Sequence, residues 1–597
     1  MALKIKKTLL YALYVFFIIM IFPHLSNAVV DYWPPDSWPQ WRNDPAKNGF
    51  NPVSTLPGTT PVVLWKYLLG GQVNSSTAVV NGKVFVGSSN GGFYCLKQVT
   101  GNPNGELLWS YSTGGEVRGS PAVAYNRVFV TSLDGYLYCF KENPPNPPNG
   151  EVIWRYYIGP LSIMCSSPAV VNERVYVGSE TGFLYCFDAL TNNPDGELLW
   201  SYYLEGWIHS SPAIKDSFVY VANSGSLPPS GYRFFCFNAL TGDSIWSFRI
   251  GDHVWGMLPT PAVANNRVYF SADDGWTRCL DASNGGVVWQ RYITDWDGPS
   301  PAVAYGRMFK TYEAYGSIIC WEAESSDSGR VIWEYDLGGA DRTGSAVADG
   351  KVLAVSWSDS LFCFDALSDS ASLLWTYSIP VTNSPGSAPS IANGMIFLGD
   401  QDGYLHALRE SGSNLPPIAY AIATPDSGSA PLFVNFSGSG EDVDGTITSY
   451  FWSFGDGDTS SLQNPLHAYS STGNYIASLQ VTDNLGATNE TTVFIKVSGV
   501  VGVIESPSSY PSLNTILVYP NPSTGSEIKF MNLPQEATLE IFTLDGRIYK
   551  RFRVEDLPLE GLFNLNDDRS EIPSRILFYI VKEKERIRDK GKLIIIR

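Results

Sequence analysis

Few residues of this 597-residue chain combine the type and the spacing that catalysis requires. Residues 87–91, Gly-Ser-Ser-Asn-Gly, have the Gly-x-Ser-x-Gly form of a hydrolase nucleophile, which must lie on a sharp turn between a strand and a helix. Short apolar runs flank the string on both sides, so a Gly-rich turn between two strands explains it better. We therefore predict no nucleophilic site.

Metal and cofactor chemistry has no better support. Four of the five histidines lie beyond the N-terminal segment, at positions 209, 253, 406 and 467, and none belongs to a His-Glu-x-x-His motif. No two cysteines are adjacent, and the sequence has neither a Cys-x-x-Cys-His haem site nor a Gly-Lys-Ser/Thr phosphate loop. The prediction is a non-enzymatic chain with no catalytic residue, metal or cofactor.

Tryptophan-rich segments offer binding chemistry instead. Exposed aromatic rings with carboxylates beside them suit sugar rings or a protein partner. The candidate ligand-binding residues are Trp207, His209, His253, Trp255, Trp276, Asp295, Trp296 and Asp297. Whether they share one surface depends on the elements that carry them.

Eight other tryptophans, spaced 42 to 46 residues apart, indicate a repeated unit. The unit that ends at Trp200 has strand-like runs at 167–170, 175–179, 183–187 and 198–202, separated by turn residues. Four short strands are the content of one propeller blade. The blade-closing tryptophans are Trp65, Trp109, Trp154, Trp200, Trp246, Trp289, Trp333 and Trp375.

The two ends of the repeat complement each other. The first three strands of the unit begin at Ser76, Ser120, Ser167, Ser211, Thr260, Ser300, Ser345 and Ala388. The Trp65 strand precedes the first trio, so it should complete the eighth blade and close the ring, which leaves only short edges. This pattern predicts an all-β chain with an eight-bladed β-propeller at residues 36–412.

A propeller would gather the candidate residues on one face. Trp207, Trp255 and Trp296 fall in loops that join one blade to the next. The turns between second and third strands carry Trp276, Tyr312, Tyr315 and Trp357. These loops and turns emerge on the same side of the ring, so we predict an exposed binding face around blades four to seven. The alternative is that the rings pack between blades.

The repeat resembles the pyrroloquinoline-quinone-type (quinoprotein-like) propeller family, whose blades carry the pattern Ala-x-Asp-x-x-x-Gly-x-x-x-Trp. Cys279, Asp281, Gly285 and Trp289 keep its spacing, with Cys in place of Ala. The resemblance implies a quinone-dependent dehydrogenase with adjacent paired cysteines and a calcium-bound centre. The sequence has no adjacent cysteines, which disfavours that enzyme.

Most cysteines occupy that one position of the repeat. They are Cys95, Cys139, Cys186, Cys236, Cys279, Cys320 and Cys363, and Ala407 fills the position in the eighth unit. Equivalent positions of neighbouring blades are too far apart for a disulfide, which needs Cα atoms within ~7 Å. We predict free thiols that act as small buried apolar residues. Cys165 lies outside this register.

A linker at 411–417 leads to a second domain at residues 416–498. Its motifs Trp-Ser-Phe-Gly-Asp-Gly (452–457) and Asn-Pro-Leu-His-Ala-Tyr (464–469) resemble the PKD (polycystic kidney disease) domain. The resemblance implies an Ig-like β-sandwich that serves as an extracellular spacer or adhesion module. Asp442, Asp444, Asp456 and Asp458 could suggest calcium, but tight Asp-Gly turns explain them better.

A second linker at 499–514 leads to residues 515–597, which alternate apolar and polar residues. Val-Tyr-Pro-Asn-Pro (518–522) and the final Gly-Lys-Leu-Ile-Ile-Ile-Arg (591–597) resemble the C-terminal sorting domain of type IX (Por) secretion. The resemblance implies a small β-sandwich that directs passage across a bacterial outer membrane by the type IX machinery. Residues 573–579 depart from the family pattern.

The N-terminus reads as a signal peptide at residues 1–28. Three lysines precede an apolar run at 9–22, and small residues follow Pro23. The run is shorter than the ~20 residues of a membrane-spanning helix, which disfavours an uncleaved anchor and a membrane span after cleavage. No Cys follows it, which excludes a lipoprotein anchor here. The formal net charge of −18 disfavours nucleic acid as a partner.

These observations predict a binding scaffold that is secreted or attached to the outer surface of a Gram-negative-type bacterium. Its propeller would present a platform for an extracellular glycan or protein. The first alternative is an extracellular polysaccharide-degrading propeller enzyme. A quinone-dependent dehydrogenase and an outer-membrane assembly factor are less favoured, because the export tail and the missing lipidation Cys argue against a periplasmic role.

Overall fold

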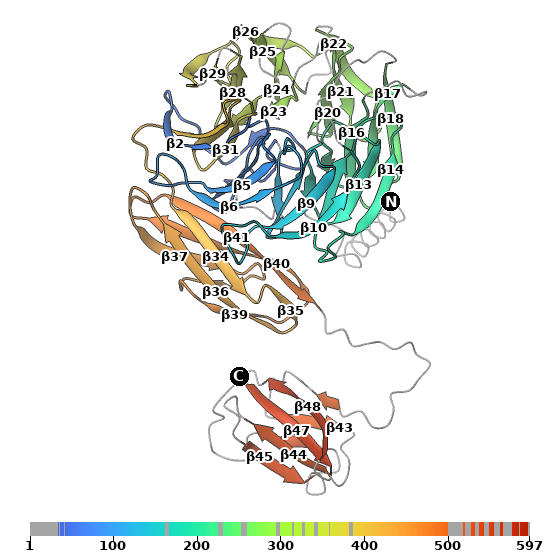
Figure 1. Ribbon diagram of the computed structural model, residues 1–597, viewed down its shortest axis with the longest axis vertical. Coiled ribbons are helices and arrows are strands. Elements are labelled where there is room, and N and C mark those ends of the chain that lie inside the picture. The colour runs from blue at the N-terminus through green and yellow to red at the C-terminus, as the bar shows by residue number, and fades with distance from the viewer. Residues whose placement is uncertain are drawn as a thin grey trace, which may run out of the picture. The chain divides into compact units, whose positions relative to one another are not determined.

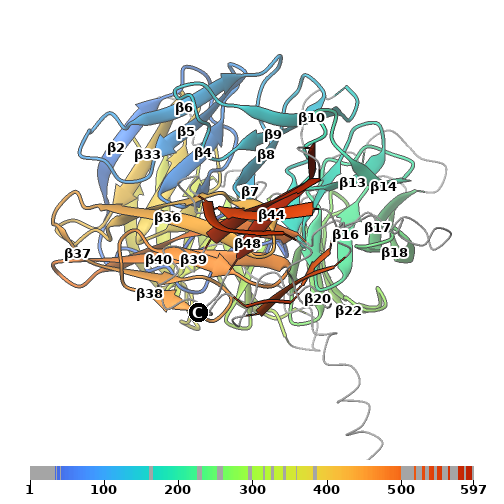
Figure 2. The same ribbon diagram turned by 90° about the horizontal axis from the view of Figure 1, so that it is seen from below.

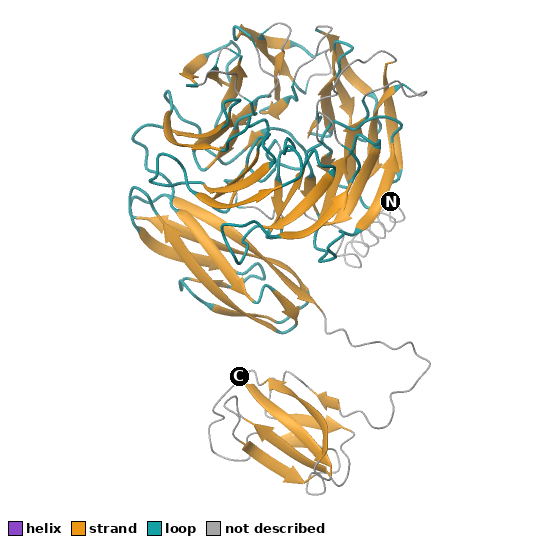
Figure 3. Cartoon of the chain, in the orientation of Figure 1, coloured by secondary structure: helices purple, strands orange, loops and turns teal. Residues whose placement is uncertain are grey.

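The computed structural model describes residues 34–498, with gaps at 35, 41, 161–165, 225–230, 252–259, 294–298, 313–315, 325–328, 340–343, 358 and 381–385, and the strands within 517–594. Its regular elements are strands throughout (Figure 3), and no helix in this part of the chain is long and apolar enough to cross a membrane. The chain divides into two compact units, Met1–Gly499 and Val500–Arg597. The predicted signal peptide and the second linker lie outside the described residues.

The first unit contains a ring of eight four-stranded antiparallel blades (Figure 1). Blade 1 is β3 (Ala78–Val80), β4 (Lys83–Gly87), β5 (Gly92–Lys97) and β6 (Leu107–Ser112); blade 2 is β7 (Ala122–Ala124), β8 (Arg127–Thr131), β9 (Tyr136–Lys141) and β10 (Val152–Tyr157). Blade 3 is β11 (Ala169–Val171), β12 (Arg174–Gly178), β13 (Phe183–Asp188) and β14 (Leu198–Tyr203); blade 4 is β15 (Ala213–Lys215), β16 (Phe218–Ala222), β17 (Tyr232–Asn238) and β18 (Ser244–Gly251). Blade 5 is β19 (Ala262–Ala264), β20 (Arg267–Ser271), β21 (Trp276–Asp281) and β22 (Val287–Tyr292); blade 6 is β23 (Ala302–Ala304), β24 (Arg307–Tyr312), β25 (Ser317–Glu322) and β26 (Val331–Asp336). Blade 7 is β27 (Ala346–Ala348), β28 (Lys351–Ser356), β29 (Ser360–Asp365) and β30 (Leu373–Ser378).

Blade 8 joins the two ends of the propeller. Its inner strands are β31 (Ser390–Ala392), β32 (Met395–Gly399) and β33 (Tyr404–Arg409), and its outer strand is β2 (Val62–Leu68) from the start of the chain. Trp65 of β2 lies directly opposite Ala407 of β33. The predicted closure by the Trp65 strand is therefore confirmed.

Each cysteine of the repeat lies opposite the blade-closing tryptophan on the neighbouring strand. Cys186 pairs with Trp200 across β13 and β14, and Cys279 pairs with Trp289 across β21 and β22. The seven cysteines of this register are buried and free, as predicted. A small apolar side chain leaves room for the indole, which explains why Cys and Ala share the position. Cys165 lies outside the described residues.

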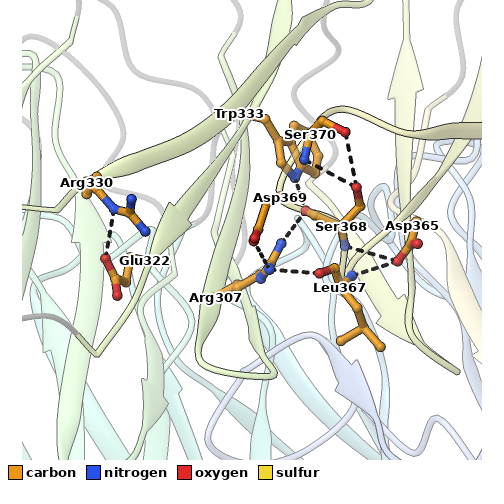
Figure 4. Close-up of polar contacts among 9 residues, drawn as sticks. All are labelled: Arg307, Glu322, Arg330, Trp333, Asp365, Leu367, Ser368, Asp369 and Ser370. Atoms are coloured by element: carbon orange, nitrogen blue, oxygen red, sulfur yellow. Dashed lines mark hydrogen bonds and ion pairs between the residues drawn. The ribbon is translucent and has the colours of Figure 1, made fainter.

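Neighbouring blades are clamped through the loop between third and fourth strands. Trp333 of blade 6 donates from Nε1 to the Ser368 carbonyl oxygen of blade 7 at 3.1 Å, and Arg307 donates to the Leu367 carbonyl and the Asp369 carboxylate of the same loop (Figure 4). The glycine of the repeat packs on the same kind of ring. A Cβ on Gly285, whose φ is +73°, would lie 2.5 Å from the Trp246 ring of the preceding blade. The Gly and Trp of the repeat are thus two sides of one contact.

Hydroxyl groups link the inner strands into a belt. The N–H of Ser76 donates to Ser120 Oγ, that of Ser120 to Ser167 Oγ, and that of Ser167 to Ser211 Oγ, all at 2.9–3.0 Å. Each acceptor belongs to the next blade around the ring. This belt explains why most trios begin with Ser or Thr.

An N-terminal segment fills the middle of the ring. Residues 38–51, here called the strap, circle the channel and bond to the inner strand of every blade in order. In blades 1, 2 and 3, the N–H groups of Val79, Val123 and Val170 donate to the Trp38 carbonyl, the Pro39 carbonyl and the Gln40 side chain. In blades 4 to 7, the N–H groups of Ile214, Val263, Val303 and Val347 donate to the carbonyls of Pro45, Ala46, Asn48 and Gly49, in that order. In blade 8, Asn51 donates to the Ile391 carbonyl at 3.0 Å. At its end, β1 (Phe50–Asn51) pairs in parallel with β27.

The following domain packs against the propeller and has two sheets. One contains β34 (Ile418–Thr424), β36 (Leu432–Glu441) and β39 (Leu466–Tyr469); the other contains β35 (Ser427–Ser429), β37 (Ile447–Ser453), β38 (Thr459–Ser460), β40 (Gly473–Asp483) and β41 (Thr488–Ser498). Asn81, in the turn between the first two strands of blade 1, accepts from the Thr492 N–H at 3.1 Å. Asn126 in blade 2 accepts from the Phe494 N–H at 3.3 Å. The spacer expected from the sequence is thus docked on the ring.

The second unit, Val500–Arg597, contains two antiparallel sheets. One sheet has β42 (Leu517–Tyr519), β43 (Glu527–Met531) and β46 (Leu562–Asn564). The other has β44 (Ala537–Phe542), β45 (Ile548–Arg553), β47 (Ile576–Glu583) and β48 (Arg586–Ile594). This arrangement agrees with the small C-terminal β-sandwich that the sequence predicts.

Candidate functional site

The propeller has two different faces. The A–B face carries the turns between the first and second strands of each blade, where the PKD-like domain docks. The B–C face carries the turns between second and third strands and the loops between blades. Three of the eight candidate residues can be located: Trp207, His209 and Trp276 lie on the B–C face, while His253, Trp255, Asp295, Trp296 and Asp297 lie outside the described residues.

Trp207 and His209 form the core of the described site. Both lie in the loop between β14 and β15, and their rings are 5.6 Å apart. The Trp207 ring is 42 % exposed, while the His209 side chain is 11 % exposed. The Trp207 backbone carbonyl accepts from the Ser224 N–H at 2.6 Å, which fixes the loop. The exposed Trp207 indole is therefore carried by a loop that a backbone hydrogen bond holds in place.

Glu180 and Ser224 hold the imidazole of His209 between them. Ser224 Oγ lies 3.1 Å from His209 Nδ1, and Glu180 Oε1 lies 3.4 Å from His209 Nε2. Burial lowers the pKa of His209 below its usual value, and the neighbouring Glu180 carboxylate opposes that shift without reversing it. A neutral imidazole can accept a hydrogen bond from Ser224 and point its N–H at Glu180.

A serine, a histidine and a carboxylate in sequence have the connectivity of a hydrolase triad. The Ser224 residue is only 1 % exposed, however, so its hydroxyl is not presented to a substrate. The arrangement is suited to positioning the Trp207 loop. Sequence reasoning missed both Glu180 and Ser224, because each occupies an ordinary turn whose partner is set only by the docking of blade 3 on blade 4.

Other aromatic residues of the B–C face differ in exposure. Trp357, between β28 and β29, is 51 % exposed, whereas Trp276 is half-buried and packs edge-on against Tyr292 at 5.8 Å. Tyr312 is buried, with its hydroxyl 3.0 Å from Thr277 Oγ1. Its expected place on an exposed face is wrong, because the ring packs between blades 5 and 6. Tyr315 lies outside the described residues.

The middle of the ring does not fit a quinone cofactor. The described cysteines lie one to a blade, so they cannot supply the adjacent pair that the quinoprotein resemblance implies. The strap occupies the channel with the buried side chains of Arg42 and Lys47. On the A–B side, strap residues such as Asp44 and Phe50 line a cavity of about 410 Å³ together with Ile214 and Lys215 of blade 4. This cavity is separate from the Trp207 cluster.

One group of potential metal ligands occurs among the described residues. Asp456, Asp458 and His467 bring their ligand atoms within 4.8 Å of one another. His467 Nε2 lies 2.7 Å from Asp456 Oδ2, and the Asp458 N–H donates to Asp456 Oδ1 at 3.1 Å. Turn formation and the His–Asp contact therefore account for the position of Asp456. Asp442 and Asp444 belong to a different turn, where Asp444 accepts from the Leu415 N–H at 3.2 Å.

Comparison with known proteins agrees with this architecture. The family described as outer membrane protein assembly factor BamB matches residues 35–143, 145–295 and 231–415, and the PKD domain family matches residues 414–497. The outer membrane protein assembly factor BamB of Yersinia pestis is 24 % identical over 228 residues, 36 % of this chain and 54 % of that protein. The tetrathionate hydrolase of Acidithiobacillus ferrooxidans is 25 % identical over 230 residues, 35 % of this chain and 44 % of that protein.

These matches are partial. The chain spans about half the length of the curated relatives that resemble its propeller. Collagenase ColQ1 of Bacillus cereus is 40 % identical over 91 residues, 15 % of this chain and 9 % of that protein. Among solved structures, the quinohemoprotein alcohol dehydrogenase of Comamonas testosteroni has a TM-score of 0.52 at 14 % identity, covering 65 % of this chain and 83 % of that one. That likeness concerns the fold alone.

Proposed function

The chain belongs to the family described as outer membrane protein assembly factor BamB, and we propose that it is a non-enzymatic binding scaffold that acts outside the cytoplasm. Its propeller presents the B–C face to a glycan or a protein. The name of the Yersinia pestis relative assigns outer membrane protein assembly to that protein, and the shared feature proposed for this chain is the binding of a partner.

The observation that carries this proposal is the exposure of Trp207 on a loop that Glu180, His209 and Ser224 hold in place. Trp357, at 51 % exposure, offers a second ring on the same face. The A–B face is covered at blades 1 and 2 by the PKD domain, and the strap fills the channel. These contacts leave the described part of the B–C face as the side that we propose for a large partner.

An extracellular or surface location is supported by the PKD domain. Similar segments occur in collagenase ColQ1, and the N-terminal residues resemble a signal peptide. We propose that Val500–Arg597 acts as the type IX sorting domain, on the resemblance of its sequence and its two-sheet architecture. Export would then place the propeller in contact with extracellular glycans or proteins.

The test uses the purified chain on a glycan array, with parallel assays for glycan cleavage. Replacement of Trp207 and Trp357 by Ala should lower the affinity for any glycan that the wild type binds at least about tenfold, as truncation of central aromatic anchors commonly does. Tyr157→Ala is the matched control, because Tyr157 is 54 % exposed but lies on the outer strand of blade 2. Unchanged binding by the Trp variants would refute the face, and glycan turnover would favour the polysaccharide-degrading enzyme.

A further inference from the structure

Three blades have their outer strands covered by a loop of the next blade. The residue that follows the blade-closing tryptophan donates its N–H to a proline carbonyl: Lys66 to Pro103 at 3.0 Å, Ser110 to Pro148 at 2.9 Å and Arg155 to Pro194 at 3.1 Å. All three loops share the sequence Pro-Asx-Gly-Glu. The loop thus acts as a short additional strand, which protects the edge of the sheet.

Among the described residues, no such loop covers the outer strand of blade 3. The corresponding loop of blade 4 is only Ala-Leu-Thr-Gly-Asp (239–243), which lacks the proline segment. Ser201 of β14 is the counterpart of Arg155, and no acceptor for its N–H is found among the described residues. β14 lies on the outer rim of the ring (Figures 1 and 2), and its outward-facing backbone is an open edge as far as the described residues extend.

A comparison within the chain shows what the missing loop changes. Strands β6 (Leu-Leu-Trp-Ser-Tyr-Ser) and β14 (Leu-Leu-Trp-Ser-Tyr-Tyr) differ at one position. In the covered β6, both leucines and the tyrosine are partly buried. In β14, Leu198, Leu199, Tyr202 and Tyr203 are 39 %, 40 %, 37 % and 54 % exposed. Leu199 and Tyr202 are thus more exposed where the loop is absent, whereas Val63 and Tyr157, the counterparts of Leu198 and Tyr203 in the covered β2 and β10, are also 39 % and 54 % exposed.

The other uncovered outer strands are less suited to pairing. β18, β22 and β26 carry Arg249, Arg291 and Glu334, and charged residues on an edge discourage strand addition. β30 has no tyrosine pair like that of β14. β14 is free of charge along its length, and the exposed Trp207 follows it by four residues.

We propose that β14 is a docking edge for an extended segment of another protein, which adds to blade 3 as a fifth strand. The covered blades supply the pattern: the occupant places a carbonyl opposite the Ser201 N–H and apolar side chains over Leu199 and Tyr203. A second copy of this chain is disfavoured, because two molecules of net charge −18 repel each other. Glu197 and Glu205 flank β14, so the segment has basic residues at its ends.

Two variants of the full chain close this edge in different ways. Ser201→Pro removes the donor, and proline is tolerated on an edge strand where the N–H faces outward. The second variant replaces Thr241-Gly242-Asp243 by the Thr-Asn-Asn-Pro-Asp-Gly-Glu of blade 3, which follows the same Ala-Leu dipeptide. That loop should cover β14 as it covers β10, while the β14 sequence stays intact.

The probe is a phage-displayed library of random octapeptides with selection on the wild-type chain. Peptides enriched on the wild type, with alternating apolar residues and basic ends, should bind both variants at least about tenfold more weakly. The proposal would be overturned if the selected peptides bound the loop variant as tightly as the wild type, or if selection on the wild type enriched no peptides beyond those enriched on the loop variant. Dimerisation of the wild type that the loop variant loses would overturn the choice of occupant in favour of a second copy.

This proposal deepens the proposed function and rests on it for the premise that the chain binds partners. The two fail separately. Loss of peptide binding in Ser201→Pro, with full retention in Trp207→Ala and unchanged glycan binding by the Trp variants, would keep the edge and refute the aromatic face. Hydrogen exchange gives a readout without any ligand: the Ser201 amide should exchange at least about tenfold faster than that of Ser110 in the wild type, and as slowly as Ser110 in the loop variant.

Discussion

The backbone N–H of Arg155 in β10 donates to the Pro194 carbonyl oxygen of the next blade at 3.1 Å. A loop that looks like a simple connection between β13 and β14 therefore completes the outer edge of blade 2. The Gly196 that follows Pro194 packs against Trp154, since a Cβ there would lie 3.3 Å from the ring. Edge protection and blade-to-blade packing are thus combined in one loop.

Shortening this loop should expose β10. Replacement of residues 191–197 by the Thr-Gly-Asp of blade 4 removes one hydrogen bond and its cover, which costs about 1 kcal/mol of unfolding free energy. Urea denaturation would measure that loss, and the Arg155 amide should exchange faster. If the Arg155 amide exchanged as slowly in the shortened variant as in the wild type, the role assigned to Pro194 would be contradicted.

The cysteines should be inert in the folded protein. Burial raises the pKa of the Cys139 and Cys279 thiols to about 12, so the thiolate fraction at pH 8 is small. In a Cys165→Ser variant, the remaining seven thiols should react with a disulfide reagent on the order of a thousandfold more slowly in native buffer than in denaturant. Rapid native labelling of several thiols would show that the register is not packed as described.

The strap should make stability depend on pH above neutrality. Burial lowers the pKa of Lys47 to about 7, so the unfolded chain binds more protons than the folded one between pH 7 and 10.5. Stability from this group therefore rises with pH across that window. Urea denaturation of the wild type at pH 7 and pH 9 should show a gain on the order of 2 kcal/mol that Lys47→Met loses.

Burial raises the pKa of Asp44 to about 6. This shift gives the stability the opposite dependence on pH, over a lower pH range. The folded form then holds its proton more tightly than the unfolded form, so stability falls as pH rises from 4 to 6. Asp44→Asn is the control, because it should leave the alkaline gain of Lys47 in place. A Lys47→Met variant with an unchanged profile between pH 7 and 9 would rule out the buried ammonium as its source.

Removal of residues 515–597 should block export. If these residues act as the sorting domain, the truncated chain stays in the periplasm with its propeller folded. Protease accessibility of whole cells, followed by immunoblotting of fractions, distinguishes the two locations. Normal surface display of the truncated chain would contradict the sorting role.

The repeat could be predicted because each unit has the same local pattern of tryptophan, glycine and strand-like runs. The position of the Trp65 strand before the first trio predicted the closure of blade 8. The repeated position of the cysteines predicted free thiols. Both predictions depend on spacing alone. The belt was visible as Ser or Thr at the start of the trios, although only the structure shows that each hydroxyl accepts from the blade before it.

The strap could not be predicted, because its residues follow no period and each contacts a different blade. The candidate site was predictable only in part. Trp207 and His209 share a loop and stand out by type, whereas Glu180 and Ser224 reach His209 from two separate turns. Tyr312 was misplaced because a tyrosine in a turn can face either solvent or the neighbouring blade.

The strap also orders events in time. It precedes every complete blade in the chain, yet its last contact joins Asn51 to Ile391, which follows it by 340 residues. Contacts between such distant positions form late in folding. The first blades can therefore assemble before the strap has made its last contact, which needs blade 8. A chain that lacks blade 8 therefore leaves the strap without the Ile391 partner of Asn51 and the ring without its closing blade.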